Sequence, residues 1–364
     1  MTQVSRVSRT HTRINRRAFS GVAAGGALAL GHRAAFATFG ESGTPAGTVE
    51  FDATPSVGGS LTIYSGRNEA LVGGLIEGIS DATGIEIEVR YGGTAELAAQ
   101  ILEEGDNSPA GLFFSQDAGA LGALAKNDRF TTLPDDVLGM VDERFQDSDG
   151  QWIGISGRAR VIVYQPEMVA EEDLPESILD LPESGIGPIG VAPSNASFQT
   201  FVTALRLTEG EDGARAWLEA LQGMDMVIYE SNGPIVDAVA NGEAAIGLVN
   251  HYYLYEKLEE NPDLTARNHY FTNGDIGGLI NVAGAGIIAG SGQEAQAEAV
   301  LRYMLGETAQ HYFAETTFEY PLASGVSPVA DLPALDEYEH PDVNLNDLDD
   351  LEGTLTLLTE LGLI

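Results

Sequence analysis

Cysteine is missing from the sequence, and lysine occurs only as Lys126 and Lys257. Without a thiol, disulfides, thiolate metal sites and cysteine nucleophiles are excluded, and we expect no lipid-modified cysteine anchor. The chain has 18 Lys and Arg residues against 55 Asp and Glu residues, so its formal net charge is −37. Because a surface this acidic repels nucleic acid and anionic lipid, we expect neither as a partner.

The common enzyme signatures are also missing. HExxH, GxSxG and the phosphate-binding GxxxxGK[ST] pattern do not occur, and the six histidines form no metal-ligand pattern. The glycines of 185–190 match the spacing of a dinucleotide-binding turn, but a proline lies within the turn and no helix is indicated after it. An enzyme, for example a secreted hydrolase, is therefore the less favoured class of function.

Residues 1–37 have the features of an export signal. An uncharged run over 18–31 is too short for the ~20 residues that span a bilayer, and it follows Arg16 and Arg17. The segment around this pair resembles a twin-arginine (Tat) export motif, and small residues at 35 and 37 fit a cleavage site. We expect an exported protein, periplasmic or at the extracellular cell surface, with a flexible linker over 38–59 and no transmembrane segment.

The acidic excess grows after the expected cleavage. Residues 1–37 contain six arginines and no acid, so the mature chain keeps 12 basic residues against 55 acidic ones. The acids are scattered rather than gathered in a tail. At molar salt, where the Debye length is ~3 Å, their mutual repulsion is screened. This composition favours a halophilic protein, adapted to concentrated salt, over a protein with a cationic partner.

Short apolar runs alternate with amphipathic segments from residue 60 onward. The first three elements are indicated as a strand, a helix and a strand of period two. Strands are expected at 61–64, 85–91, 111–114, 160–164, 226–229 and 245–249, and helices at 69–82, 94–103, 198–207, 213–221, 293–315 and 353–361. This alternation predicts an α/β fold with parallel or mixed sheets.

A tandem of tyrosines is the strongest chemical signal. Tyr252 and Tyr253 follow the expected strand at 245–249, and Tyr255 comes two residues later. A phenol with a pKa near ~10 ionises at neutral pH only beside strong positive charge, which a trivalent metal that prefers anionic oxygen supplies. Paired tyrosines also pack as amphipathic wall residues, and these residues alone leave both roles open.

Five segments, in the same order and spacing over roughly 60–328, resemble the periplasmic ferric-ion-binding proteins that supply iron ABC transporters. They are 64–69, 102–110, 156–161, 250–255 and 319–322. The resemblance implies a two-lobed periplasmic-binding-protein fold of type II with hinge strands between the lobes. It also implies Fe3+ as the transported ligand, held by Tyr252 and Tyr253 as phenolates, and no enzymatic activity. The implied partners are a transporter permease and its ATPase, and we expect a monomer.

The resemblance is less complete on the other side of the implied metal site. Asn68 stands where some family members have a metal-binding histidine, Glu69 where others have a tyrosine, and Gln116 where some have a glutamate. All three are candidate ligands, with Glu69 supplying a carboxylate. Glu69 has an equally good alternative role as a first-turn acid favoured by the helix dipole.

The family also implies an anion, such as carbonate or phosphate, bound together with the iron. Arg158 and Arg160 are two residues apart on an expected strand, so both side chains lie on one face. The start of the helix at 198–207 offers free backbone N–H groups to an anion. The full set of candidates is Arg158, Arg160, Asn195, Ala196, Ser197, Asn232 and Asn250. Those at helix starts have an alternative role as ordinary caps.

We expect lobe 1 to comprise 60–158 and 270–290 and lobe 2 to comprise 159–269 and 291–364, with crossing strands near 157–163 and 277–288. Closure of the lobes would bury the ion in the cleft between them. The main alternative is a binding protein of the same fold that takes a small anion or organic solute without iron.

Overall fold

Residues 58–323, 325–329, 332–335 and 339–364 are described by the computed structural model of the chain. The expected signal peptide over 1–37 and the expected linker up to residue 57 lie outside these residues. Within the described part of the chain, no helix is long and apolar enough to cross a membrane.

The described chain begins with the predicted strand-helix-strand unit. β1 (Ser60–Ser65) and β2 (Glu86–Tyr91) are parallel neighbours, and α1 (Glu69–Thr83) connects them. Asn68 caps α1, because its side-chain oxygen accepts a hydrogen bond from a first-turn N–H at 2.9 Å. Gly84 ends the helix in the left-handed conformation (φ 67°), which a residue without Cβ adopts without strain.

The strands form one mixed sheet. The other strands are β3 (Leu112–Ser115), β4 (Ile153–Tyr164), β5 (Ile189–Val191), β6 (Met226–Ile228), β7 (Ile246–Asn250), β8 (Arg267–His269), β9 (Ile280–Ile287) and β10 (Tyr320–Pro321). Their order is β2-β1-β3-β9-β4-β7-β5-β6, and β8 and β10 each pair with β4. β9 is antiparallel to β3 and β4, and β4 is antiparallel to β7, whereas the other pairs along this order are parallel. The predicted α/β class is confirmed, with a mixed sheet.

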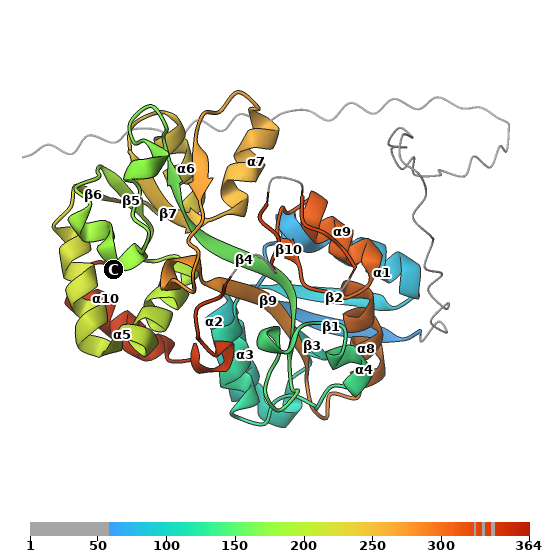
Figure 1. Cartoon of the computed structure of the whole chain (residues 1–364). Coiled ribbons are helices and arrows are strands. Elements are labelled where there is room, and N and C mark those ends of the chain that lie inside the picture. The colour runs from blue at the N-terminus through green and yellow to red at the C-terminus, as the bar shows by residue number, and fades with distance from the viewer. Residues whose placement is uncertain (1–57, 324, 330–331, 336–338) are drawn as a thin grey trace, which may run out of the picture. The chain divides into compact units, whose positions relative to one another are not determined.

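β4 joins two groups of strands. Its first half pairs with β9 over 153–159, and its second half pairs with β7 over 160–164. All 12 residues of β4 are buried. β1, β2 and β3 lie on one side of β4 and β9, and β5, β6 and β7 lie on the other (Figure 1). β4 and β9 thus lie between two groups of strands, and the lobe boundaries expected from the sequence stay a prediction.

Helices cover both groups of strands (Figure 1). Those beside β1, β2 and β3 are α1, α2 (Thr94–Glu104), α3 (Ala118–Ala125), α4 (Asp135–Leu138), α8 (Glu294–Met304) and α9 (Glu307–Glu315). Those beside β5, β6 and β7 are α5 (Ala196–Gln222), α6 (Asn232–Ala240), α7 (Tyr252–Glu260) and α10 (Leu351–Glu360). Because α8 contacts α1 and β1, we propose that 294–315 belong to lobe 1. The other lobe boundaries remain predictions.

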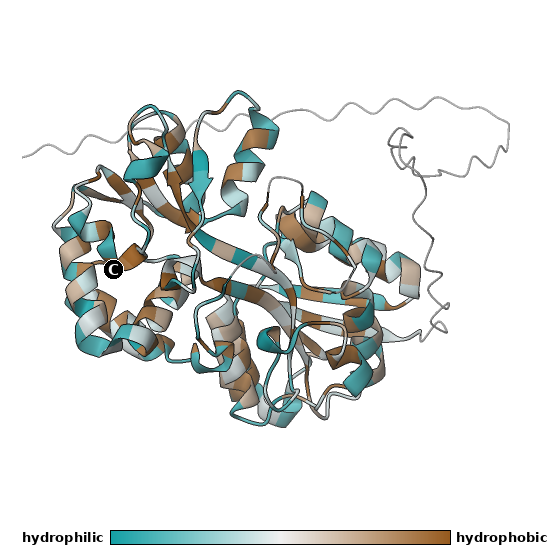
Figure 2. Cartoon of the chain, viewed as in Figure 1, coloured by the Kyte–Doolittle hydropathy of each residue, from teal (hydrophilic) through white to brown (hydrophobic). Residues whose placement is uncertain are grey.

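The hydrophobic core follows the sheet. Figure 2 shows hydrophobic residues along the strands, while hydrophilic residues lie mainly on the helices and loops. α5 spans 27 residues across a kink at Gly210 (φ 75°). The sequence predicts two helices here, at 198–207 and 213–221. The non-helical backbone of Gly210 (φ 75°, ψ 170°) separates two helical segments within α5, as this prediction expects.

Candidate functional site

The tandem tyrosines lie where β7 ends and α7 begins. β7 stops at Asn250, His251 follows, and Tyr252 is the first residue of α7. The two phenol rings stack with their centroids 4.3 Å apart and an interplanar angle of 27°. Tyr252 is 3% exposed, and Tyr253 is half-buried. The fold therefore presents both phenols together from one helix start.

Three buried arginines act electrostatically on these phenols. Arg158 and Arg160 come from β4, where the alternation of side chains puts both on one face. Arg67 comes from the loop after β1, and its Nη2 pairs with a Glu319 carboxylate oxygen at 2.7 Å. Arg158 Nε lies 3.7 Å from the other oxygen of Glu319. Two of the three guanidinium groups thus face Glu319, while Asp117 near Arg158 and Glu256 near Arg67 add further acidic groups to this cluster.

Burial keeps the Tyr252 phenol neutral in the unliganded protein. It raises the pKa of Tyr252 well above the ordinary value of 10.0, and Tyr253 raises it further, while Arg158 and Arg67 lower it. Tyr252 is therefore protonated at neutral pH, and a bound cation is needed to favour its phenolate. Burial also lowers the pKa of Arg160 to about 9, so this side chain remains charged at neutral pH.

A hydrogen-bond network surrounds the start of α5. Asn195 caps the helix, with its side-chain oxygen accepting from the Ser197 backbone N–H at 2.9 Å and from the Ser197 hydroxyl at 2.6 Å. The same hydroxyl accepts from Arg160 Nη1 at 3.3 Å and from Asn232 Nδ2 at 3.2 Å. Arg160 Nη2 and Asn232 Oδ1 are buried and have no hydrogen-bond partner in the described part of the chain. These two atoms can therefore still bind a polar ligand.

Asn250 and Ala196 complete the predicted set on this side. Asn250 is 3% exposed and lies opposite Arg160 in the pairing of β4 with β7. Ala196 is the first residue of α5 and lines a cavity. The structure thus brings Arg160, Asn195, Ser197 and Asn232 into one network and places Asn250 beside it.

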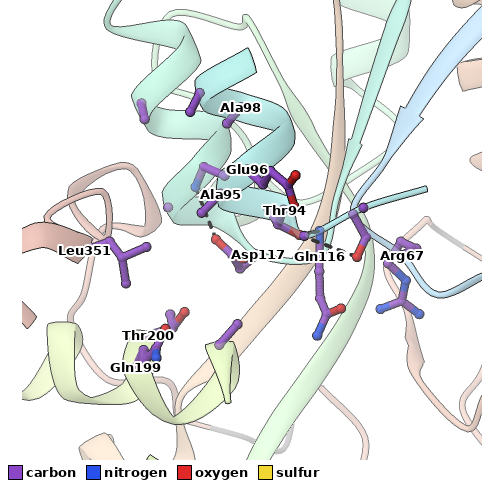
Figure 3. Close-up of a pocket in the computed structure, with 18 of the residues that line it drawn as sticks. Arg67, Thr94, Ala95, Glu96, Ala98, Gln116, Asp117, Gln199, Thr200 and Leu351 are labelled. Carbon is purple, nitrogen blue, oxygen red and sulfur yellow. Dashed lines mark hydrogen bonds between the residues drawn. The ribbon is translucent and has the colours of Figure 1, made fainter. Parts of the chain in front are cut away.

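The cavity has a volume of about 870 Å³ and lies between α2 and α3 on one side and α5 on the other. Figure 3 shows Gln116 and Asp117 on one wall and Gln199 and Thr200 of α5 on the opposite wall. Among the predicted residues, Asn68, Glu69, Gln116 and Ala196 line it. Tyr252 and Tyr253 lie outside the described lining, so the structure does not bring all predicted ligands together.

Three candidate ligands line the wall of the cavity opposite α5, which we call the far wall: Asn68, Glu69 and Gln116. The Asn68 side-chain oxygen is used as the cap of α1, and Glu69 is an exposed first-turn acid. The backbone oxygen of Gln116 accepts from Arg158, while its side chain extends into the cavity (Figure 3). The described residues hold no cluster of three His, Cys, Asp or Glu side chains that could bind a metal. A metal site here depends on the tyrosines.

Four residues at the site carry no role in the sequence prediction. Arg67 and Glu319 occur inside segments that carry the resemblance, and their pairing joins positions 252 residues apart. Glu256 lies one turn after Tyr252 on α7, and burial together with Glu319 raises its pKa to about 7. His251 is fully buried, and burial lowers its pKa to about 4. The scarcity of basic residues is the one sequence signal that could have marked Arg67.

The chain matches known proteins over most of its length. The family described as bacterial extracellular solute-binding protein matches residues 107–350. The Fe(3+)-binding periplasmic protein of Serratia marcescens is 31% identical over 309 residues, which are 84% of this chain and 90% of that protein. The major ferric iron-binding protein of Neisseria meningitidis serogroup B is 28% identical over 316 residues, which are 85% of this chain and 95% of that protein.

Solved structures give the same result for the fold. Iron-bound HitA from Pseudomonas aeruginosa superposes with a TM-score of 0.78 at 33% identity, over 83% of this chain and 99% of that one. The apo ferric ion-binding protein A of Pasteurella haemolytica gives a TM-score of 0.73 at 24% identity, over 83% and 98% of the two chains. The two-lobed periplasmic-binding-protein fold is therefore confirmed.

Proposed function

Because the chain belongs to the family of bacterial extracellular solute-binding proteins, we propose that it captures ferric iron and delivers it to an ABC importer. The observation that carries this proposal is the stacked pair of phenols at the start of α7, set among buried guanidinium groups. Phenolate is a hard, anionic oxygen donor that suits a trivalent cation. The relatives named for ferric iron span most of this chain, which supports the same ligand here.

Iron binding releases protons from Tyr252 and Tyr253. Both phenols ionise on coordination, and the positive charges of Arg67 and Arg158 favour the Tyr252 phenolate. No bond of a substrate is made or broken, so the protein acts as a carrier and not as an enzyme.

An anion, carbonate or phosphate, completes the site on the side of α5. Arg160 Nη2 is a buried donor free to bind it, and the start of α5 adds the partial positive charge of a helix N-terminus. Arg158 supplies a second positive charge from the same face of β4. Asn195, Ala196, Ser197, Asn232 and Asn250 form the surrounding polar wall.

The far wall contributes when the lobes close. Asn68, Glu69 and Gln116 line the cavity from the lobe that does not carry the tyrosines. Glu69 is the one anionic side chain among the three, so it is the first candidate to meet the iron. Its exposure in the described structure leaves it free to move.

Export and transport partners follow from this role. We infer that a twin-arginine signal directs the protein to the periplasm or the cell surface, where a monomer docks on a permease that is driven by its ATPase. The acidic composition supports a halophilic setting. A melting temperature that climbs with molar NaCl, and that sucrose at low salt does not raise, would support that setting.

A visible absorption spectrum tests the proposal. Addition of ferric citrate to the iron-free protein should produce a phenolate-to-iron charge-transfer band. A protein that stays colourless but binds phosphate or an organic anion tightly would instead be an anion carrier of the same fold. Turnover of any substrate would support the enzyme alternative and contradict the proposal.

A further inference from the structure

His251 is a buried ring directly before the tyrosine pair, and both of its nitrogens are hydrogen-bonded. Nδ1 accepts from the Ala159 backbone N–H at 3.1 Å, and Nε2 lies 2.7 Å from the Phe318 carbonyl oxygen. An N–H can only donate and a carbonyl oxygen can only accept. The imidazole is therefore neutral, with its hydrogen on Nε2.

The first of these contacts connects the start of α7 to β4, the strand that carries Arg158 and Arg160. Ala159 lies between Arg158 and Arg160 on β4. The Ala159 carbonyl oxygen also accepts from the backbone N–H of His251 at 3.0 Å, so both backbone groups of Ala159 bind His251. The residue before the tyrosines is thus held at two points on the strand that carries two of the three guanidinium groups.

The second contact ties the start of α7 to the Glu319 segment. Phe318 has a left-handed backbone (φ 54°), which is uncommon for a residue with a side chain. The next residue is Glu319, whose carboxylate pairs with Arg67 at 2.7 Å and accepts from the Ser156 hydroxyl at 3.2 Å. Through Phe318, His251 therefore links the tyrosine pair to an ion pair that reaches the loop after β1.

We propose that His251 is a positioning residue. Its neutral imidazole, hydrogen-bonded to two other segments, fixes the position at which the phenol oxygens of Tyr252 and Tyr253 bind the metal. This inference rests on the proposed ferric site. The ring itself takes no part in coordination, because both nitrogens are already bonded to the backbone. Its own carbonyl accepts from Asn268 Nδ2 at 2.9 Å, which holds the residue from a third side. Without the imidazole, the residue that precedes α7 loses its side-chain hydrogen bonds to Ala159 and Phe318.

Two substitutions separate this role from simple packing. His251→Phe keeps an aromatic ring against Tyr252 and Tyr320, whose ring centroids lie 6.0 Å and 5.0 Å from that of His251, but it can neither donate nor accept. His251→Gln retains one acceptor and one donor on a side chain of similar reach. His269→Phe is the control for loss of a histidine ring away from the tyrosine pair. His269 is a half-buried histidine on β8, and its ring packs edge-on to Phe271 with the centroids 5.2 Å apart.

The four full-length proteins are loaded with ferric citrate. We expect His251→Phe to shift the charge-transfer band and to release iron to a chelator ~10-fold faster, the scale of one lost hydrogen bond. His251→Gln should restore part of both, and His269→Phe should match the unmodified protein. If His251→Phe keeps the band and the release rate while only its melting temperature falls, the residue is merely structural and the proposal is wrong.

Hydrogen exchange in the iron-free proteins measures how firmly His251 holds the start of α7 when no iron is bound. The Ala159 amide and the amides of α7 should exchange faster in His251→Phe than in His269→Phe. Equal protection in the two variants would overturn the proposal. If the unmodified protein gives no band with ferric citrate, the proposed function fails, and the exchange comparison alone decides whether His251 holds the tyrosine pair in place.

Discussion

The proposed site has a tyrosine side and, across the cavity, a far wall, and the two differ in how deeply their side chains are buried before a ligand binds. On the tyrosine side, Tyr252, Arg158 and Arg160 are at least nine-tenths buried. On the far wall, Asn68 and Glu69 are exposed, and the Asn68 side chain caps α1. One side is organised before any ligand binds, whereas the other consists of surface residues at a helix start.

The difference follows from where each side lies in the fold. Arg158 and Arg160 belong to a strand with neighbours on both edges and no exposed residue. Asn68 and Glu69 lie at the junction of a loop and a helix, where side chains satisfy the free N–H groups of the first turn. Pre-organised ligands lose little conformational entropy on binding, so we expect the tyrosine side to dominate iron affinity.

The largest effect should come from the tyrosines. Tyr253→Phe and Tyr252→Phe each remove a phenol oxygen but keep the stacked ring, so the fold should survive. We expect at least a ~100-fold loss of iron affinity, beyond the range for residues around a metal rather than on it. A bleached or shifted charge-transfer band would report the same loss. An unchanged spectrum in both variants would remove the tyrosine side from the site altogether.

Lower pH should weaken iron binding next most strongly. Burial raises the pKa of Tyr252 above 10, so this phenol is protonated without iron and must release its proton on binding. Each phenol that ionises should lower affinity by about tenfold per unit fall in pH. Competition with a chelator at several pH values measures this slope. A slope that Tyr253→Phe leaves unchanged would mean that Tyr253 releases no proton.

Loss of an arginine should have an intermediate effect. Arg160→Gln removes the donor Nη2 and one buried charge, and Arg158→Gln removes another charge near Tyr252. We expect iron release to be ~10-fold faster, and faster still when carbonate and phosphate are left out of the buffer. Release rates that ignore both the substitutions and these anions would show that no anion completes the tyrosine side.

The far wall should give the smallest effect. Asn68→Ala removes the cap of α1 and should lower the free energy of unfolding by about 1 kcal/mol with little change in iron affinity. Glu69→Gln is the matched control, because it removes the neighbouring charge and leaves the cap intact. Thermal melts and iron titrations of both variants compare the two roles. A large loss of affinity in Glu69→Gln would make Glu69 a ligand and end the asymmetry between the two sides.

Local sequence patterns determined much of what is described. The period of apolar residues marked the strands and helices, because both elements repeat over a few residues and bury one face. The tandem of Tyr252 and Tyr253 was also visible in the sequence, because two residues that are adjacent in the chain remain neighbours in any fold. The acidic excess and the missing cysteines are set by composition alone.

The tertiary structure decided which distant residues meet. Glu319 pairs with Arg67, which is 252 positions away, and His251 bonds to Ala159 and Phe318 from two other segments. No local period records such contacts, because they depend on the order of strands around β4 and on the turn at Phe318. The cap role of Asn68 depended on backbone geometry as well. Burial is a property of the folded chain. It distinguishes the buried side chains of the tyrosine side from the exposed Asn68 and Glu69 of the far wall.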